Sequence, residues 1–60
     1  MKREEIFEFL KGKNKPMTAR EIAEEGNFNS NTVRKVLGEL KREGAVNIIM
    51  EEEKTKYIKS

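Results

Sequence analysis

The chain has 60 residues, a net charge of +2 and a charged fraction of 40%. A chain of this length buries only about 60% of its unfolded surface, so a deep substrate pocket is not expected. His, Cys, Asp, Trp and Gln are absent, which removes the usual general base, the thiol nucleophile and the commonest zinc ligands. The acidic residues are all Glu and stand among Lys and Arg, where carboxylates are usually solvated. We therefore expect no enzyme, no metal site, no cofactor and no small-molecule ligand.

The same composition bears on where the protein works. A small secreted domain normally needs disulfides, and this chain has no cysteine. No apolar run approaches the roughly 20 residues that span a bilayer, and no signal peptide is recognisable. These features predict a cytoplasmic protein that does not enter a membrane. The Lys- and Glu-rich composition, free of Gln and Cys, favours a thermophilic source.

Charge distribution is more informative than the net charge. Glu residues occur throughout 1–25 and 39–53, whereas none occurs from Gly26 to Gly38. That acid-free stretch contains Arg34 and Lys35. The pattern indicates a surface that a polyanion could approach.

Residues 3–11 and 19–25 are predicted to form the first two helices. Ile6, Phe9 and Leu10 fall on one stripe of the first helix, and the segment from Gly12 to Pro16 is expected to end it. Met17 is placed to make a short extended contact. Thr18 and Glu21 have the spacing of a capping box, so the second helix should begin after Thr18. It should end at the Gly26-Asn27 pair.

Residues 30–43 are predicted to form a third helix, with Asn29 as its N-cap and Gly44 as its terminator. At 100° per residue, four apolar side chains fall within about 60° of one direction and form the core face: Val33, Val36, Leu37 and Leu40. The opposite side carries Asn31, Lys35, Gly38 and Arg42, with Thr32 and Arg34 on its flanks.

The pattern changes to alternation in residues 45–59, which predicts a β-hairpin. Its turn falls within Glu51 to Lys54 and lacks the Asn-Gly or Asp-Gly pair that would fix the register. The chain is thus expected to be one α+β domain spanning residues 1–60, with three helices followed by a C-terminal hairpin.

Two stretches carry a family resemblance. Residues 15–23 read KPMTAREIA, and residues 29–46 read NSNTVRKVLGELKREGAV. They are similar to the winged helix-turn-helix transcriptional regulators of the MarR-like and ArsR-like type, and the resemblance covers nearly the whole chain. It implies a small transcriptional regulator that binds double-stranded DNA by inserting its third helix into the major groove.

The resemblance also implies which residues meet DNA. Bases or groove walls would be contacted from the third helix. Phosphates would be contacted by Thr18 and by lysines of the predicted hairpin of residues 45–59, which is the wing of this fold; Lys59 is one of them. Gly38 would either permit close approach of the helix backbone to a partner or merely relieve crowding. Together with the exposed side of the third helix, the candidate DNA-binding residues are Thr18, Ser30, Asn31, Thr32, Arg34, Lys35, Gly38, Arg42, Lys54 and Lys56.

The wing departs from the family pattern, because its tip carries Glu51, Glu52 and Glu53, which repel phosphates. This favours an alternative in which the winged helix is a protein-interaction module of a replication or transcription assembly, with Phe7, Ile49 and Tyr57 as exposed contact candidates. Binding of left-handed DNA or structured RNA is a weaker third hypothesis. A homodimer and a protein partner both stay open.

Overall fold

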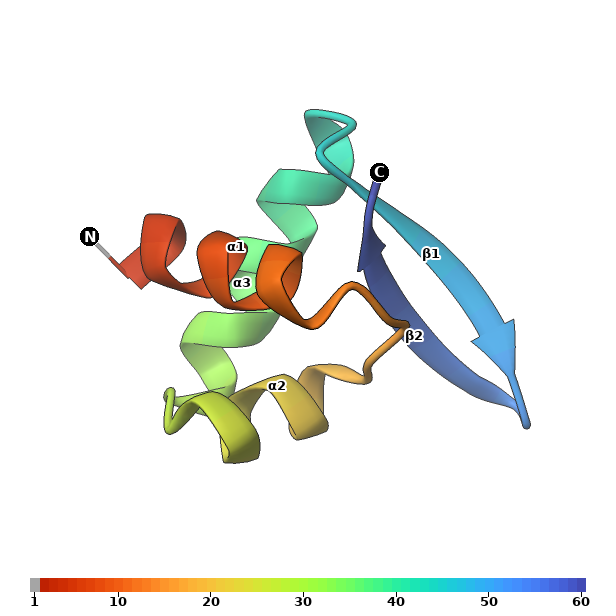
Figure 1. Ribbon diagram of the computed structural model, residues 1–60, viewed down its shortest axis with the longest axis horizontal. Coiled ribbons are helices and arrows are strands. Elements are labelled where there is room, and N and C mark those ends of the chain that lie inside the picture. The colour runs from red at the N-terminus through yellow and green to blue at the C-terminus, as the bar shows by residue number, and fades with distance from the viewer. Residues whose placement is uncertain (1) are drawn as a thin grey trace.

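Three helices followed by an antiparallel hairpin make up the computed structural model, which describes residues 2–60 (Figure 1). In chain order the elements are α1 (Lys2–Lys13), α2 (Ala19–Gly26), α3 (Ser30–Arg42), β1 (Val46–Glu51) and β2 (Lys54–Lys59). The expected α+β winged-helix layout is confirmed. Among the described residues, no helix is long and apolar enough to cross a membrane.

Side-chain caps fix where α2 and α3 begin. The Glu21 N–H donates to the Thr18 hydroxyl oxygen at 3.1 Å, and the Thr18 N–H donates to the Glu21 carboxylate at 2.9 Å. This confirms the predicted capping box. The side-chain oxygen of Asn29 accepts the Asn31 N–H at 2.9 Å, which confirms the predicted cap of α3. Asn27, with a φ of 58°, ends α2 in the left-handed conformation.

The first helix is longer than the sequence predicted, and Gly12 does not end it. Helix α1 runs on through Gly12 to Lys13, and Asn14 adopts a φ of 51° directly after it. The Asn14 N–H donates to the carbonyl of Leu10 at 3.2 Å. Asn tolerates the left-handed region, so it ends the helix in place of the glycine.

Gly44 turns the chain from α3 into the hairpin. It has a φ of 79°, and its N–H donates to the Lys41 carbonyl at 3.0 Å. The next N–H, of Ala45, reaches back to the Leu40 carbonyl at 2.9 Å. This pair of bonds is a Schellman motif, which requires a positive φ at the glycine position.

The hairpin closes through a two-residue turn at Glu52 and Glu53, flanked by the cross-strand pair Glu51 and Lys54. Both turn residues have positive φ, 51° and 63°, as a type I′ turn requires. On the other side of β2, Met17 and Tyr57 exchange two backbone hydrogen bonds of 3.0 and 2.7 Å. These bonds confirm the extended contact expected of Met17. They tie the segment before α2 to the wing.

The helices and the wing share one small core. Its buried side chains are Ile6, Leu10, Met17, Ile22, Ala23, Val33, Val36, Leu37, Leu40 and Val46. The Phe9 and Phe28 rings join α1 to the turn between α2 and α3, edge to face, with centroids 5.8 Å apart. The whole inner face predicted for α3 is therefore in the core.

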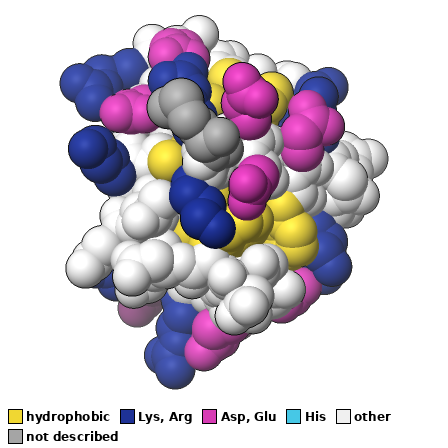
Figure 2. All heavy atoms as spheres, turned by 90° about the vertical axis from the view of Figure 1, so that its left-hand side faces the viewer, with side chains coloured by type: hydrophobic (Ala, Val, Ile, Leu, Met, Phe, Trp, Pro, Cys, Tyr) yellow, Lys and Arg dark blue, Asp and Glu magenta, His cyan; other side chains and the backbone are white. Residues whose placement is uncertain are grey.

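The apolar side chains expected to be exposed are mostly covered. Phe7 and Tyr57 are half-buried and pack against the core, and Ile49 is also half-buried. The expectation that these three are freely exposed is therefore wrong, because helix and hairpin packing covers part of each. Among residues 2–60, the exposed large apolar side chain is Met50, at 65%. Some apolar surface remains visible beside the N-terminal end of α1, bordered by acidic and basic side chains (Figure 2).

Candidate nucleic-acid interface

The side of α3 that faces away from the core is polar and open to solvent. Asn31, Lys35, Gly38 and Arg42 are all exposed, as the helical period predicted. Ser30 is the first residue of the helix, directly after its N-cap, and is exposed as well. Side chains with hydrogen-bond donors and acceptors are thus concentrated at the N-terminal end of the exposed side, where major-groove recognition helices present them.

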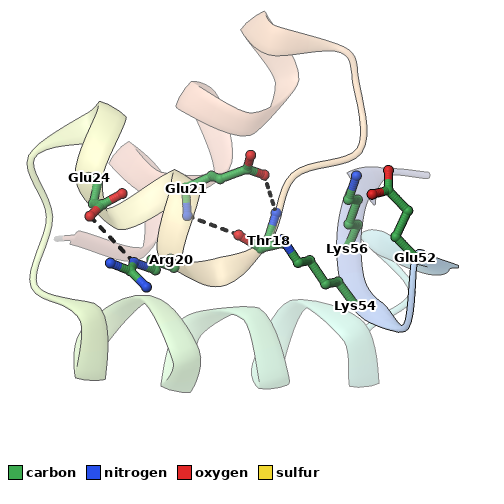
Figure 3. Close-up of a pocket in the computed structure, with 7 residues that line it drawn as sticks. All are labelled: Thr18, Arg20, Glu21, Glu24, Glu52, Lys54 and Lys56. Atoms are coloured by element: carbon green, nitrogen blue, oxygen red, sulfur yellow. Dashed lines mark hydrogen bonds and ion pairs between the residues drawn. The ribbon is translucent and has the colours of Figure 1, made fainter.

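The candidate residues of the wing and of α2 come together in one hollow of about 630 Å³ (Figure 3). Thr18 lines it from the start of α2, and Lys54 and Lys56 line it from β2. Lys54 extends toward Thr18 (Figure 3). The structure therefore brings Thr18 beside Lys54 and Lys56, two further predicted phosphate-contacting residues that are far from it in the sequence.

Acidic side chains reach the same hollow and change its character. Lys56 is bound to Glu51, with 3.0 Å between the ammonium nitrogen and the carboxylate oxygen. The hydrogen bond that Lys56 donates to the Glu51 carboxylate is the main reason why the pKa of Lys56 is raised, and Glu52 contributes a smaller Coulombic effect. Glu52 also lines the hollow. Carboxylates of the wing therefore offset part of the positive charge of its lysines.

Two of the three predicted cations of α3, Arg34 and Lys35, lie on opposite flanks of its exposed side. Arg34 faces α2, where it shares a hollow of about 460 Å³ with Ser30 and Arg20. Lys35 faces α1, where it shares a hollow of about 440 Å³ with Thr32. The open strip of helix between the two cations continues to Gly38.

Cations of α3 differ from most others in having no acidic partner. Within residues 2–60, Arg34, Lys35, Lys41 and Arg42 form no ion pair. The cations that do form ion pairs are Lys2, Arg3, Lys11, Lys13, Arg20 and Lys56. Positive charge that is free to meet a polyanion is thus gathered on α3.

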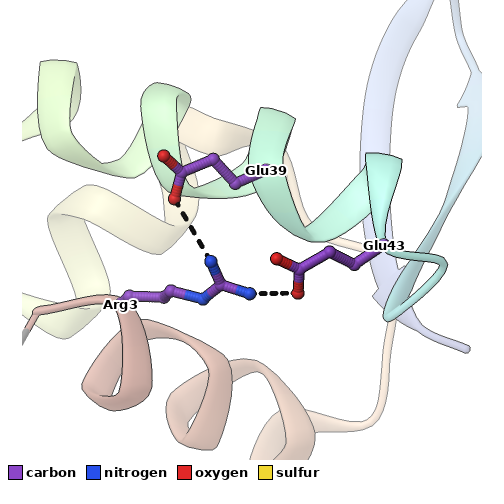
Figure 4. Close-up of polar contacts among 3 residues, drawn as sticks. All are labelled: Arg3, Glu39 and Glu43. Carbon is purple, nitrogen blue, oxygen red and sulfur yellow. Dashed lines mark hydrogen bonds and ion pairs between the residues drawn. The ribbon is translucent and has the colours of Figure 1, made fainter.

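Glu39 of α3 and Glu43, the residue that caps the end of this helix, both contact α1. One guanidinium nitrogen of Arg3 lies 3.5 Å from Glu39, and another is hydrogen-bonded to Glu43 (Figure 4). The hydrogen bond with Glu43 is the main reason why the pKa of Arg3 is raised. Arg3 therefore contacts both carboxylates at this end of α3, a helix whose other charged side chains are positive.

Gly38 has no packing reason to be a glycine. A Cβ atom built on it would meet nothing within 4 Å apart from the helix's own backbone. Glycine costs about 1 kcal/mol relative to alanine in a helix interior. The hypothesis that Gly38 relieves crowding is therefore wrong for the isolated chain.

Two basic residues of this surface were not among the candidates predicted from the sequence. Arg20 lies at the start of α2 and lines both hollows beside that helix. Lys41 lies three residues after Gly38 on the exposed side of α3. Helical spacing could have identified Lys41, which falls near the direction of Arg34. Arg20 could not be identified in this way, because only the packing of α2 against the wing shows which hollow it lines.

The family comparison agrees with this arrangement. Residues 5–59 match the family model described as sugar-specific transcriptional regulator TrmB. No curated protein and no solved structure matches the chain. The expectation of a winged-helix transcriptional regulator is confirmed, with TrmB as the family that matches. The chain belongs to the TrmB family of transcriptional regulators and is a small DNA-binding regulator of that kind.

Proposed function

We propose that residues 1–60 act as a single DNA-binding domain that places α3 in the major groove and works by occupancy rather than by chemistry. In this proposal Ser30, Asn31 and Thr32 meet base edges, and the cations of α3 meet the phosphate backbone. Thr18 and Lys54 meet a further phosphate beside α2. Double-stranded DNA is the ligand, and we assign none of the residues to a free sugar that would act as a regulatory ligand.

The observation that carries the proposal is the set of four cations on α3 that lack an ion pair within residues 2–60. Cations without partners are available to displace the counterions of DNA, which supplies much of the affinity in protein–DNA complexes. Glu39 of α3 and the cap residue Glu43 pair with Arg3 and with none of these four cations.

A salt titration tests this proposal. Binding of the 60-residue chain to random duplex DNA is measured at several salt concentrations, for the wild type and for the variants Arg34→Ala and Lys35→Ala. Each lost phosphate contact should reduce the magnitude of the slope of log K against log[salt] by about 0.9. Lys13→Ala is the matched control, since it removes a paired cation of α1 and should leave the slope unchanged.

The alternative function, a protein-interaction module, makes the opposite prediction. If Arg34 and Lys35 are dispensable for DNA binding at low salt, the placement of α3 in the groove is wrong. The interaction-module hypothesis then gains support if a change at Met50, the exposed large apolar residue, abolishes association with a protein. Phe7 and Tyr57 no longer favour the interaction-module hypothesis, because both side chains pack against the core of the domain.

We propose a cytoplasmic location, as expected from the sequence. The DNA-bound form is either a monomer or a homodimer. Strand β1 pairs with β2 along one edge only, so its other edge is available to a second copy. A dimer should protect two half-sites about 10 bp or a multiple apart, whereas a monomer should protect one short segment. Footprinting together with sedimentation of the free protein distinguishes the two.

A further inference from the structure

Gly38 lies at the centre of a ring of positive charge. On a helix surface, the neighbours of a residue are those three and four positions away. For Gly38 these four neighbours are Arg34, Lys35, Lys41 and Arg42, and all of them are exposed. None of them forms an ion pair within the described part of the chain.

The centre of that ring is bare backbone. A Cβ atom at Gly38 would meet no atom within 4 Å apart from the helix's own backbone, so the space above it is open solvent in the free protein. The backbone N–H and carbonyl of a residue in mid-helix are used within the helix, so Gly38 itself offers no hydrogen bond. What the glycine provides is room for another molecule to approach the helix axis more closely than a side chain would allow.

We propose that Gly38 and its four surrounding cations form a docking site for the sugar–phosphate backbone of one DNA strand. The phosphate lies among the four cations, and the sugar packs on the bare Cα. This inference rests on the proposed function and adds a contact to it. Bases are read from the N-terminal end of α3 at Ser30 and Asn31, about two turns away, so Gly38 contributes to affinity and not to sequence choice.

The experiment uses Gly38→Ala and Gly38→Leu, which add side chains of increasing size while keeping good helix formers. Gly12→Ala is the matched control, because Gly12 is also helical and exposed and a Cβ on it would also meet nothing within 4 Å. Thermal unfolding of each variant is measured first. Binding is then measured to random duplex DNA and to a sequence selected in vitro for tight binding.

The expected result is a separation of stability from binding. Both alanine variants should raise the Tm: Gly38→Ala, in mid-helix, by about 4–8 °C, and Gly12→Ala, next to the end of α1, by less. Gly38→Ala should weaken binding by about tenfold, equally on random and selected DNA, Gly38→Leu should weaken it further, and Gly12→Ala should not weaken it.

Three outcomes would overturn the inference. Unchanged or tighter binding by Gly38→Ala would show that nothing approaches the bare backbone. A loss confined to the selected sequence would assign Gly38 to a base edge instead of the sugar–phosphate backbone. A similar loss in Gly12→Ala would mean that the effect does not depend on the ring of cations. If the wild type itself fails to bind duplex DNA, the proposed function fails first, which makes the two failures distinguishable.

Discussion

Arg3 of α1 lies 3.5 Å from Glu39 of α3, although Lys35 stands four residues before Glu39 on the same helix. Residues four apart on a helix can form ion pairs, so Glu39 has Lys35 within reach as well as Arg3. Its contact with Arg3, which also binds Glu43, leaves Lys35 without a partner among residues 2–60. Arg3 thus acts as a positioning residue for the charge of α3.

We predict that Arg3→Gln weakens DNA binding even though Arg3 is not assigned to the DNA surface. With Arg3 removed, Glu39 becomes available to Lys35 and Glu43 is no longer compensated. The loss should reach about fivefold at low salt, the scale of an exposed ion pair, and should shrink as salt is added. The slope of log K against log[salt] should also decrease in magnitude by up to about 0.9, as if one phosphate contact were lost.

A second substitution separates this effect from a loss of packing. Adding Glu39→Gln to Arg3→Gln removes the carboxylate that would neutralise Lys35, so binding and slope should recover. If Arg3→Gln lowers the free energy of unfolding but the double variant does not restore the slope, Arg3 has only a structural role.

The turn of the wing provides the second prediction. Glu52 and Glu53 both adopt positive φ, which costs a residue other than glycine about 1–2 kcal/mol. Replacing them with Asn and Gly, the pair that type I′ turns prefer, should stabilise the protein by about 1–2 kcal/mol. Thermal unfolding measures the gain as a higher Tm.

A control variant separates the effect of the Glu52 and Glu53 charges on stability from the effect of their backbone conformation. The control variant Glu52→Gln with Glu53→Gln removes the same two charges and keeps the unfavourable backbone, so it should gain little stability. In DNA binding the two variants should behave alike: both should bind more tightly if the tip lies near phosphates, and neither should if it points away. A stability gain of equal size in both would show that charge repulsion, and not backbone conformation, destabilises the turn.

The helix ends and the core face of α3 could be predicted because their signals are local. The cap at Thr18, the left-handed Asn27 and the inner position of Leu37 each follow from neighbouring residues. The role of Gly12 was predicted wrongly, because a glycine near a helix end competes with a better-placed Asn14 two residues later.

The charge state of the site could not be predicted, because it depends on contacts between distant segments. Arg3 and Glu43 are 40 residues apart, and no helical or strand period connects them. The pairing of Lys56 with Glu51 depends on the hairpin register, which the turn sequence did not fix. Composition showed where acids were absent, whereas only the fold shows which cations are left without partners.

The capping box of α2 gives a prediction about pH. The Glu21 carboxylate accepts the Thr18 N–H at 2.9 Å, and this hydrogen bond is the main cause of a pKa below the ordinary 4.5. Lys56 and Lys15 lower it further through smaller Coulombic effects. Since the pKa in the folded state is the lower one, the stabilisation is present above pH 4.5. It is lost as pH falls through the folded-state value.

The measurement compares the free energy of unfolding of the wild type and of Glu21→Gln between pH 7 and acid conditions. The amide can still reach back to the cap but cannot ionise, so the advantage of the wild type should shrink as pH falls below 4.5. Thr18→Ala is the control: it removes the hydroxyl and keeps the backbone N–H that Glu21 accepts, so its pH dependence should resemble that of the wild type. A difference between wild type and Glu21→Gln that does not change with pH would contradict the assignment.

The turn between α2 and α3 gives the final prediction, which concerns the contact between Gly26 and Phe28. A Cβ atom added to Gly26 would overlap a ring carbon of Phe28, and that ring packs edge to face against Phe9. Because the ring cannot move without losing this contact, Gly26→Ala should destabilise the protein by about 1–3 kcal/mol, the usual cost of overpacking. Phe28→Leu removes the braced ring, so adding Gly26→Ala to that variant should cost much less. The four free energies of unfolding form a double-mutant cycle whose coupling term measures the clash. A coupling near zero would show that the ring yields freely, and that the angle between α2 and α3 does not depend on this glycine.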